Sequence, residues 1–170
     1  MKNKIIYLIT TLFLIFIFLI LFKGLNKSNL YEPKSEIKVV PEFFAIDFLG
    51  REINSKNIFD KNNFYLVNIW ASWCVPCKAE HPYLMNLSSK NEIEIIGLNY
   101  KDKKENAKKF LNDLGNPYKI ILLDKKGNIS IDWGAYGVPE TFLVYEKKII
   151  KKFIGPINAE SVREIEKILK

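Results

Sequence analysis

Residues 70–80 of the chain are Trp-Ala-Ser-Trp-Cys-Val-Pro-Cys-Lys-Ala-Glu, and this segment contains its only two cysteines, Cys74 and Cys77. The apolar run from Phe64 to Ile69 before it is typical of a strand that is covered on both faces. The residues after it, from about Cys74 to Ser88, predict a helix. The sequence therefore places a Cys-x-x-Cys pair where a buried strand passes into a helix.

This position gives the two sulfurs different chemical roles. The first turn of a helix carries N–H groups without partners, and these groups and the helix dipole favour a thiolate over a thiol at Cys74. Cys77 lies on nearly the same face of the helix and can close a disulfide with Cys74. We expect Cys74 to be the partly exposed nucleophile and Cys77 to be more buried. Pro76 suits the first helical turn, where its missing N–H is no loss.

A structural cysteine pair and a metal site are the alternatives. A disulfide across so short a gap constrains the unfolded chain very little, so stability is a weak reason for the pair. His81 lies nearby, but the chain has no other Cys or His, so zinc would need a carboxylate or a second molecule as ligand. A haem attachment motif needs His directly after Cys77, where Lys78 stands. We expect no metal, no cofactor, and His81 on the helix surface.

The N-terminal segment differs from the rest of the chain. No charged residue interrupts the stretch from Ile5 to Phe22. As a helix it would rise about 27 Å, close to a bilayer core of about 30 Å. Lys2 and Lys4 before it favour a cytoplasmic N-terminus, although lysines also follow it. A cleaved signal peptide usually has a shorter apolar core and ends at small residues, which are absent here. We predict that residues 1–22 are a cytoplasmic N-terminus and an uncleaved transmembrane anchor.

The remaining chain divides into a tether and one domain. Residues 23–40 show no clear hydrophobic period and predict a tether, whereas residues 41–170 are long enough for a domain with its own core. The net charge is +7, but four lysines lie in the first 27 residues, and the remainder carries 22 basic and 19 acidic residues. Arginines are rare, and the lysines of residues 101–109 are interleaved with acids, as on a solvated helix face. We therefore exclude nucleic-acid binding.

The order of predicted elements defines the fold class. Alternating strands and helices, followed by a hairpin and a last helix, predict an α/β fold with a mixed, mainly parallel central sheet and helices on both faces. Gly115 ends the second helix of the domain, and Asn158 caps the last one. The predicted strands are Phe43–Phe48, Arg51–Ile53, Phe64–Trp70, Glu92–Asn99, Tyr118–Leu123, Thr141–Tyr145 and Ile149–Ile154; the predicted helices are Cys74–Ser88, Lys103–Leu114 and Asn158–Leu169, with residues 129–138 irregular or one short helix.

The surroundings of the cysteines resemble the thioredoxin-like superfamily. An apolar strand leads to Trp-Cys-x-x-Cys, Pro82 lies eight residues after Cys74, and Val138-Pro139 leads into a later strand. The resemblance implies a thioredoxin-like fold in which Pro139 has a cis peptide bond and faces the cysteines across the site. From the residues alone, Pro139 would be an ordinary loop proline, since cis bonds are a small minority even before proline.

Four segments in order carry a closer resemblance. They are residues 73–82 (Trp-Cys-Val-Pro-Cys-Lys-Ala-Glu-His-Pro), 97–102 (Gly-Leu-Asn-Tyr-Lys-Asp), 114–118 (Leu-Gly-Asn-Pro-Tyr) and 136–142 (Tyr-Gly-Val-Pro-Glu-Thr-Phe). Together they resemble the CcmG/DsbE family, the membrane-anchored bacterial thiol:disulfide interchange proteins of cytochrome c maturation. The resemblance covers residues 41–170 and the general plan of an N-terminal anchor.

This resemblance implies a single-pass protein of the bacterial cytoplasmic (inner) membrane whose catalytic domain faces the periplasm. Through Cys74 and Cys77 it would reduce disulfides of apocytochrome c or of a thiol maturation factor, and a transmembrane electron donor would reduce it again. The alternatives are a general extracytoplasmic thiol reductase, a thiolate metal-binding or delivery module, and a docking domain without activity. The sequence does not give the direction of electron flow, which depends on the potentials of the partners.

Two acids are further candidates for the site. Many thioredoxins carry a buried Asp six residues before the nucleophile, but here that position is Asn68, which cannot take a proton. The resemblance suggests that Glu80, one helical turn after Cys77, and Glu140 line the site. Burial beside thiols would raise the pKa of either carboxyl and let it carry protons. Without such burial, both would be ordinary solvated acids.

Two tryptophans also lie close to the cysteines in sequence. Trp73, directly before Cys74, offers flat apolar surface to a partner protein. Trp70 either flanks the site or belongs to the core.

Overall fold

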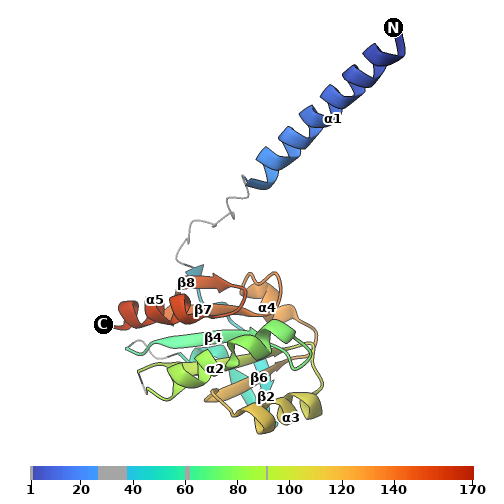
Figure 1. Ribbon diagram of the computed structural model, residues 1–170. Coiled ribbons are helices and arrows are strands. Elements are labelled where there is room, and N and C mark those ends of the chain that lie inside the picture. The colour runs from blue at the N-terminus through green and yellow to red at the C-terminus, as the bar shows by residue number, and fades with distance from the viewer. Residues whose placement is uncertain (1, 27–37, 60–61, 91) are drawn as a thin grey trace. The chain divides into compact units, whose positions relative to one another are not determined.

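The computed structural model describes residues 2–26, 38–59, 62–90 and 92–170 (Figure 1). The chain divides into two compact units, Met1–Glu36 and Ile37–Lys170. The predicted tether lies largely outside the described residues. Its described end, Lys38–Val39, is strand β1 and pairs with strand β8. The folded unit therefore begins before residue 41, where we expected it to start.

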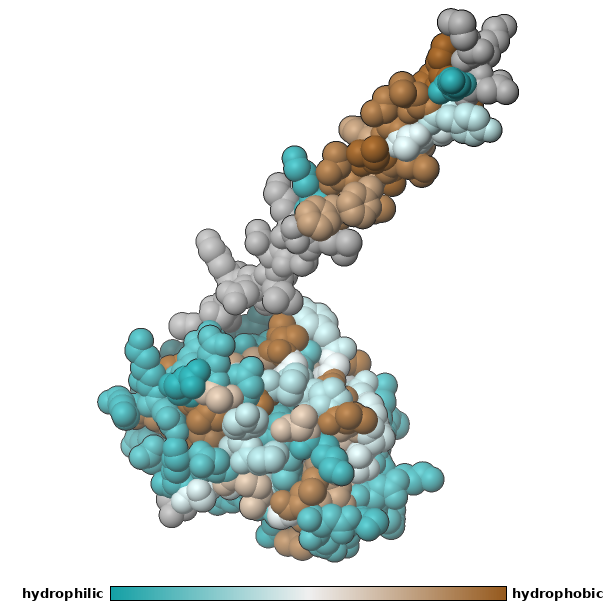
Figure 2. Space-filling model, viewed as in Figure 1, coloured by the Kyte–Doolittle hydropathy of each residue, from teal (hydrophilic) through white to brown (hydrophobic). Residues whose placement is uncertain are grey.

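The described residues of the first unit, 2–26, form helix α1 (Lys2–Asn26). Its segment Lys4–Lys23 is long and apolar enough to cross a membrane, and none of it is buried within the protein. Figure 2 shows hydrophobic side chains along this helix. Since no protein surface covers these side chains, α1 is a candidate transmembrane helix, as the sequence predicts.

The second unit is built on one sheet, whose strand order in the described residues is β1-β8-β7-β4-β5-β6-β2-β3. Its strands are β1 (Lys38–Val39), β2 (Phe44–Asp47), β3 (Glu52–Asn54), β4 (Tyr65–Trp70), β5 (Glu94–Tyr100), β6 (Ile120–Asp124), β7 (Glu140–Tyr145) and β8 (Lys148–Ile154). Its helices are the 3₁₀ turn η1 (Ser55–Asn57), α2 (Val75–Ser88), α3 (Lys104–Leu114), α4 (Asn128–Asp132) and α5 (Ala159–Leu169).

The pairing of the strands confirms a mixed sheet and corrects the prediction that it is mainly parallel. Only the pairs β4–β5 and β5–β6 are parallel, and helices α2 and α3 make their crossovers. The pairs β1–β8, β2–β3, β2–β6, β4–β7 and β7–β8 are antiparallel. Hairpins join antiparallel strands, and in the part of the chain that the structure describes they connect β2 to β3 and β7 to β8. The predicted Arg51–Ile53 hairpin strand is confirmed as β3.

Strand β4 lies in the centre of the sheet, and every one of its residues is buried. Its side chains alternate between the two faces of the sheet. Leu66 and Trp70 belong to the core under α2, α3 and α5, whereas Val67 and Ile69 belong to the core on the opposite face, which α4 and the segment around η1 cover. The run of β4, apolar at nearly every position, follows from this two-sided burial. The chain passes from the end of this buried strand, at Trp70, to Cys74 within four residues.

The ends of the helices follow the local signals in the sequence. The Asn158 side chain caps α5 by accepting hydrogen bonds from the N–H groups of Glu160 and Ser161. Gly115 ends α3 with φ 91°, in the region that favours glycine. The segment expected to be irregular or one short helix forms the five-residue helix α4.

Candidate redox site

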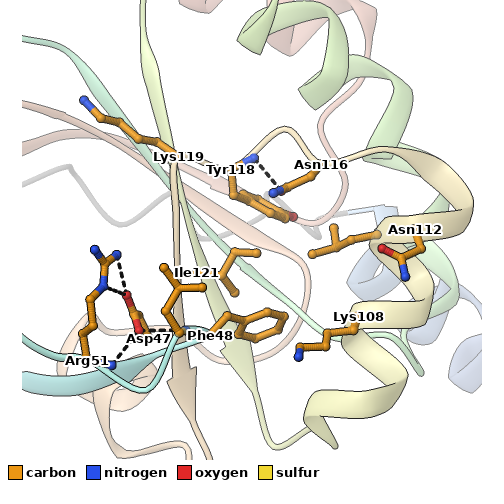
Figure 3. A pocket seen from close by; sticks show the side chains of 11 residues that line it. Asp47, Phe48, Arg51, Lys108, Asn112, Asn116, Tyr118, Lys119 and Ile121 are labelled. Atoms are coloured by element: carbon orange, nitrogen blue, oxygen red, sulfur yellow. Dashed lines mark hydrogen bonds and ion pairs between the residues drawn. The ribbon is translucent and has the colours of Figure 1, made fainter.

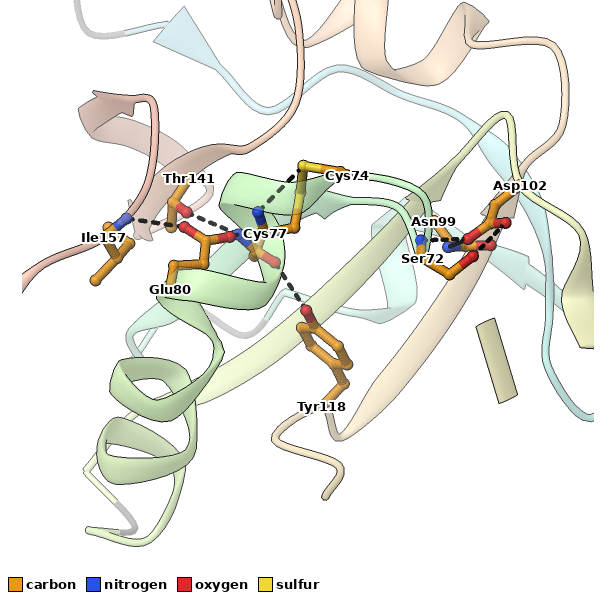
Figure 4. Close-up of a disulfide and its surroundings, with 10 residues drawn as sticks. Ser72, Cys74, Cys77, Glu80, Asn99, Asp102, Tyr118, Thr141 and Ile157 are labelled. Atoms are coloured by element: carbon orange, nitrogen blue, oxygen red, sulfur yellow. Dashed lines mark hydrogen bonds between the residues drawn. A yellow bond between two sulfur atoms is a disulfide. The ribbon is translucent and has the colours of Figure 1, made fainter. Parts of the chain in front are cut away.

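The two cysteines form a disulfide at the start of α2 (Figure 4). Their sulfurs are 2.07 Å apart and their Cα atoms 5.3 Å apart. Cys74 is the N-cap residue of α2, and Pro76 lies in the first turn, as predicted. Strand β4 ends at Trp70 and α2 begins at Val75, so the cysteine pair lies at the carboxyl end of β4.

The first turn of α2 presents an N–H group to the sulfur of Cys74. The backbone N–H of Cys77 donates a hydrogen bond to Cys74 Sγ, with 3.1 Å between nitrogen and sulfur. This donor would stabilise a negative charge on the same sulfur once the disulfide is reduced, together with the helix dipole. The local geometry therefore favours the thiolate form of Cys74 once the disulfide is reduced.

The prediction that Cys74 is partly exposed is wrong for this oxidised form. Cys74 is 4% exposed and Cys77 is 2% exposed. In the disulfide, Cys74 Sγ is bonded to Cys77, and both residues pack in the core cluster with Trp70 and Ala71. The apolar surface next to the disulfide is more accessible, because Trp73 is 56% exposed and Val75 is also exposed.

A carboxylate holds the loop that leads to Cys74. Asp102 accepts hydrogen bonds from both the backbone N–H of Ser72, at 2.6 Å, and its hydroxyl, at 2.8 Å. The N–H of Cys74 in turn donates to the carbonyl of Ala71. The Trp73 indole N–H donates to the carbonyl of Lys101, next to Asp102. The segment after β5 therefore fixes the turn that places Cys74.

Pro139 has the cis peptide bond that the resemblance implies. It directly precedes Glu140, which pairs with Ile69 near the end of β4. The cis peptide therefore lies at the edge of the sheet from which the chain continues to the cysteines. That Pro139 faces the disulfide and contacts a substrate stays a prediction.

Glu80 is completely buried, one helical turn after Cys77. One of its carboxylate oxygens accepts a hydrogen bond from the Asn68 amide at 2.9 Å, and the other accepts from the backbone N–H of Ile157 at 2.8 Å. Burial raises the pKa of Glu80 to about 7, against these two hydrogen bonds, which lower it. The site thus contains an acid that can gain or lose a proton near neutral pH.

Asn68 is the centre of this buried cluster, and its partners Glu80, Thr141 and Tyr118 are labelled in Figure 4. Its amide group also donates to the Thr141 hydroxyl at 2.9 Å, and its carbonyl oxygen accepts from the Tyr118 hydroxyl at 2.8 Å. Thr141 and Tyr118 come from segments far from the cysteines in sequence. Hydrophobic periodicity identified neither as a site residue, although both lie in segments that resemble the CcmG/DsbE family.

The structure does not bring Glu140 together with Glu80. Thr141 lies on the face of β7 that meets Asn68 and Glu80, so the preceding residue, Glu140, points to the opposite face. Glu140 is buried there and forms an ion pair with Lys152, with 2.7 Å between Oε2 and Nζ. Its other oxygen accepts from the N–H groups of Tyr136 and Gly137. Its described contacts are structural.

His81 is buried, so its predicted surface position is wrong. Its Nε2 lies 3.0 Å from the carbonyl oxygen of Gly115, and its ring packs edge-on against Phe110. Burial lowers the pKa of His81, although the Gly115 carbonyl favours the protonated form. This imidazole therefore joins α2 to the end of α3. Among the described residues, no group of three or more His, Cys, Asp or Glu side chains is placed to hold a metal ion.

A Cys-x-x-Cys disulfide at a helix start beside a mixed sheet of this order defines the class of thioredoxin-fold thiol–disulfide oxidoreductases. Comparison with known proteins agrees. A family model described as Redoxin matches residues 38–169. Among solved structures, the thioredoxin domain of a thiol-disulfide oxidoreductase from Bacteroides vulgatus has a TM-score of 0.64 at 24% identity, covering 78% of this chain and 96% of that one. That likeness shows the shared fold.

Two relatives show to which group within the redoxin family the chain belongs. The thiol:disulfide interchange protein DsbE of Pasteurella multocida is 40% identical over 162 residues, which cover 92% of this chain and 89% of that protein. The thiol:disulfide interchange protein CycY of Rhizobium leguminosarum is 46% identical over 105 residues, 61% of this chain, and the match spans 56% of that relative's length. The chain belongs to the redoxin family and, within it, to the thiol:disulfide interchange proteins of the DsbE and CycY type.

Proposed function

We propose that this chain is a membrane-anchored reductant of protein disulfides that works in the periplasm through Cys74 and Cys77. The observation that carries the proposal is the hydrogen bond from the Cys77 N–H to Cys74 Sγ at the start of α2. It favours the thiolate form of Cys74 after reduction, and the thiolate is the species that attacks a disulfide. Exposed Trp73 and Val75 beside it offer apolar surface to a partner.

The exchange has two steps. In the reduced protein, the Cys74 thiolate attacks one sulfur of a substrate disulfide, forms a mixed disulfide, and releases the other substrate sulfur as a thiolate. Cys77 then loses its proton and attacks Cys74 Sγ, which releases the second substrate thiolate. The substrate gains two electrons, and the chain is left with the Cys74–Cys77 disulfide. A dithiol of a transmembrane electron donor restores the reduced form.

Glu80 is suited to take the proton of Cys77 in the second step. It lies one helical turn further along α2 and is fully buried, with a pKa of about 7. A base is most effective when its pKa lies near the working pH. Asn68 stands where many thioredoxins have an Asp that can accept the proton of the second cysteine. Its hydrogen bond to Glu80 supports Glu80 of α2 as the proton acceptor in this chain.

The proposal also names a substrate and a location for the protein. Resemblance to the CcmG/DsbE proteins supports apocytochrome c, or a thiol maturation factor that acts on it, as the protein that is reduced. The candidate transmembrane helix over Lys4–Lys23 supports a single-pass anchor in the inner membrane. With the N-terminus in the cytoplasm, the domain that follows lies in the periplasm.

A trapping experiment tests this function. Cys77→Ser in the full-length chain leaves Cys74 able to attack but unable to be released, so mixed disulfides accumulate. We expect a cytochrome c or a maturation factor among the trapped proteins, and the double variant Cys74→Ser/Cys77→Ser is the control that traps none. Recovery of many unrelated secreted proteins would favour a general thiol reductase. Absence of any trapped protein would contradict exchange through Cys74.

A further inference from the structure

The buried cluster behind the disulfide contains a phenol to which the exchange reaction assigns no role. The Tyr118 hydroxyl donates to Asn68 Oδ1, while Asn68 Nδ2 donates to Glu80 Oε1 and to Thr141 Oγ1. We propose that Tyr118 is a positioning residue of the redox site, whose hydroxyl fixes the Asn68 amide with its NH₂ group toward Glu80. The inference deepens the proposed exchange and concerns the same site.

Hydrogen-bond chemistry decides between the two possible orientations of the amide. In the observed orientation, the NH₂ group of Asn68 meets two oxygen acceptors and its carbonyl meets a hydroxyl, so every group has a suitable partner. In the reversed orientation, the carbonyl of Asn68 would face the carboxylate of Glu80, and two acceptors would repel each other unless Glu80 were protonated. The Tyr118 hydroxyl would also lose its acceptor, since it makes no other hydrogen bond within the described residues.

The phenol is held firmly enough to impose this orientation. Its ring stacks on Trp70, with 5.2 Å between ring centroids. Gly97 lies so close to both rings that a Cβ there would be 2.9 Å from the Tyr118 ring and 2.8 Å from Trp70 Nε1. The backbone N–H of Tyr118 donates to the side chain of Asn116 (Figure 3). The hydroxyl therefore cannot turn away from Asn68 without disturbing a packed core.

Among the described groups around Glu80, the side-chain amide of Asn68 is the one that can exchange the positions of its carbonyl and its NH₂ group. Strand β4 contributes Asn68, β7 contributes Thr141, the segment before α5 contributes the Ile157 N–H, and α2 contributes Cys77. Within the described residues, no ion pair reaches the Glu80 carboxylate. Tyr118 is the titratable group that faces this cluster from the segment before β6. Burial and the nearby Glu80 raise its pKa, so it stays a neutral donor at working pH.

Loss of the Tyr118 hydroxyl should therefore make Glu80 easier to protonate. With Tyr118→Phe, the amide of Asn68 can turn its carbonyl toward Glu80 and accept a hydrogen bond from the protonated carboxyl. The experiment is a carbon-13 NMR titration of the Glu80 carboxyl in the full-length oxidised chain in detergent micelles. We expect the pKa of Glu80 to rise by about one pH unit, the size expected for one hydrogen bond to a charged group. The control, Tyr145→Phe, removes a phenol outside the cluster and should leave it unchanged.

An unchanged Glu80 titration in folded Tyr118→Phe would overturn the inference. If this variant does not fold, the unmodified protein still decides, through the side-chain amide protons of Asn68. We expect stronger nuclear Overhauser effects from these protons to the Thr141 methyl group than to the Tyr118 ring, and the reverse order would also overturn the inference. Neither measurement involves a substrate, so a shifted Glu80 titration in Tyr118→Phe would support the positioning role of Tyr118 even if the trapping experiment contradicted exchange through Cys74 or the proposed substrate.

Discussion

Lys152 of β8 reaches across to the buried carboxylate of Glu140 on β7 and forms an ion pair with it, with 2.7 Å between Nζ and Oε2. The same ammonium donates to the carbonyl of Gly134 at 2.7 Å and lies 4.3 Å from the centroid of the Tyr136 ring. One lysine thereby ties the segment before the cis peptide of Pro139 to the sheet. Glu140 is held by this contact and by the backbone N–H groups of Tyr136 and Gly137, and a role in proton transfer stays a prediction.

Loss of the Lys152 ammonium should destabilise the domain. In Lys152→Gln, the carboxylate of Glu140 would stay buried without its counter-ion. Breaking a fully buried pair costs about 3–5 kcal/mol, and we expect a loss near the lower end of this range because Lys152 is partly exposed. Urea unfolding of the oxidised protein, followed by tryptophan fluorescence, measures the change in the free energy of unfolding.

The neighbouring lysine is a matched control. Lys151 pairs with Glu164 on the surface, where both side chains are well exposed. Lys151→Gln should therefore change the free energy of unfolding by less than about 1 kcal/mol. Equal effects of the two substitutions would contradict a special role for the Lys152–Glu140 pair.

Glu80 should make the stability of the protein depend on pH in a defined direction. Its pKa is about 7 in the folded protein and 4.5 as the reference value for an unfolded chain. Between these two values the folded protein binds more protons than the unfolded chain, so the free energy of unfolding falls as the pH rises through this window. The loss is absent below the window and reaches about 3 kcal/mol above it.

Glu80→Gln should remove most of this dependence, because its neutral side chain does not titrate. Urea unfolding at pH values from about 4 to 8, in steps of about one unit, gives the free energy of unfolding of the variant and of the parent protein as a function of pH. The exposed acid Glu105, on α3, provides the control substitution Glu105→Gln, which should keep the slope of the parent protein. Parallel curves for Glu80→Gln and the parent would show that Glu80 is not the buried acid described here.

Asp102 should control the reactivity of Cys74 through the turn at Ser72. Its carboxylate accepts hydrogen bonds from the backbone and side chain of Ser72, from the Asn99 amide and from the N–H of Lys103. In Asp102→Asn an NH₂ group would face some of these donors. We expect the rate constant for attack of reduced Cys74 on a peptide disulfide to fall about tenfold, because small displacements of a reacting atom are costly.

The exposed Asp113 of α3, which pairs with Lys109, is the control for removal of one acidic charge. Stopped-flow measurement of mixed-disulfide formation should give the same rate constant for Asp113→Asn as for the parent. If Asp102→Asn also kept the parent rate, the contact between Asp102 and Ser72 would have no role in placing Cys74.

Local patterns predict most of the secondary structure, and their failures have physical causes. The apolar run of β4 and the spacing of α2, α3 and α5 reflect burial that the sequence records directly. The predominance of antiparallel pairs could not be predicted, because β2 pairs with β6 and β7 pairs with β4 across long separations in sequence. Strand order depends on tertiary contacts that leave no local period.

The site divides in the same way. The position of Cys74 and Cys77 at a helix start, and the place of Pro76 in its first turn, follow from local sequence. The cis peptide before Pro139 follows only from the family resemblance. The buried position of His81 could not be predicted, because a lone histidine in a helix gives no sign that the distant Gly115 carbonyl lies within hydrogen-bond distance of its ring.

Contacts between distant segments account for the site residues that the sequence did not reveal. Tyr118 reaches Asn68 from fifty positions away in the chain, and Lys152 meets Glu140 across a hairpin. Asp102 offered one signal, since a polar residue just after the parallel strand β5 lies at the same sheet edge as the loop after β4. Alternation along β7 also assigns Glu140 and Thr141 to opposite faces once the strand is known.

The proposed exchange depends on the ionisation of the Cys74 thiol, and the pH dependence of its alkylation measures that ionisation. The reduced full-length chain is treated with iodoacetamide over a range of pH, and mass spectrometry follows modification of Cys74 separately from Cys77. We predict that the rate at Cys74 reaches half its maximum at least about one pH unit below the value of about 8.5 for a free cysteine. A half-maximal rate at or above the free-thiol value would contradict the central claim.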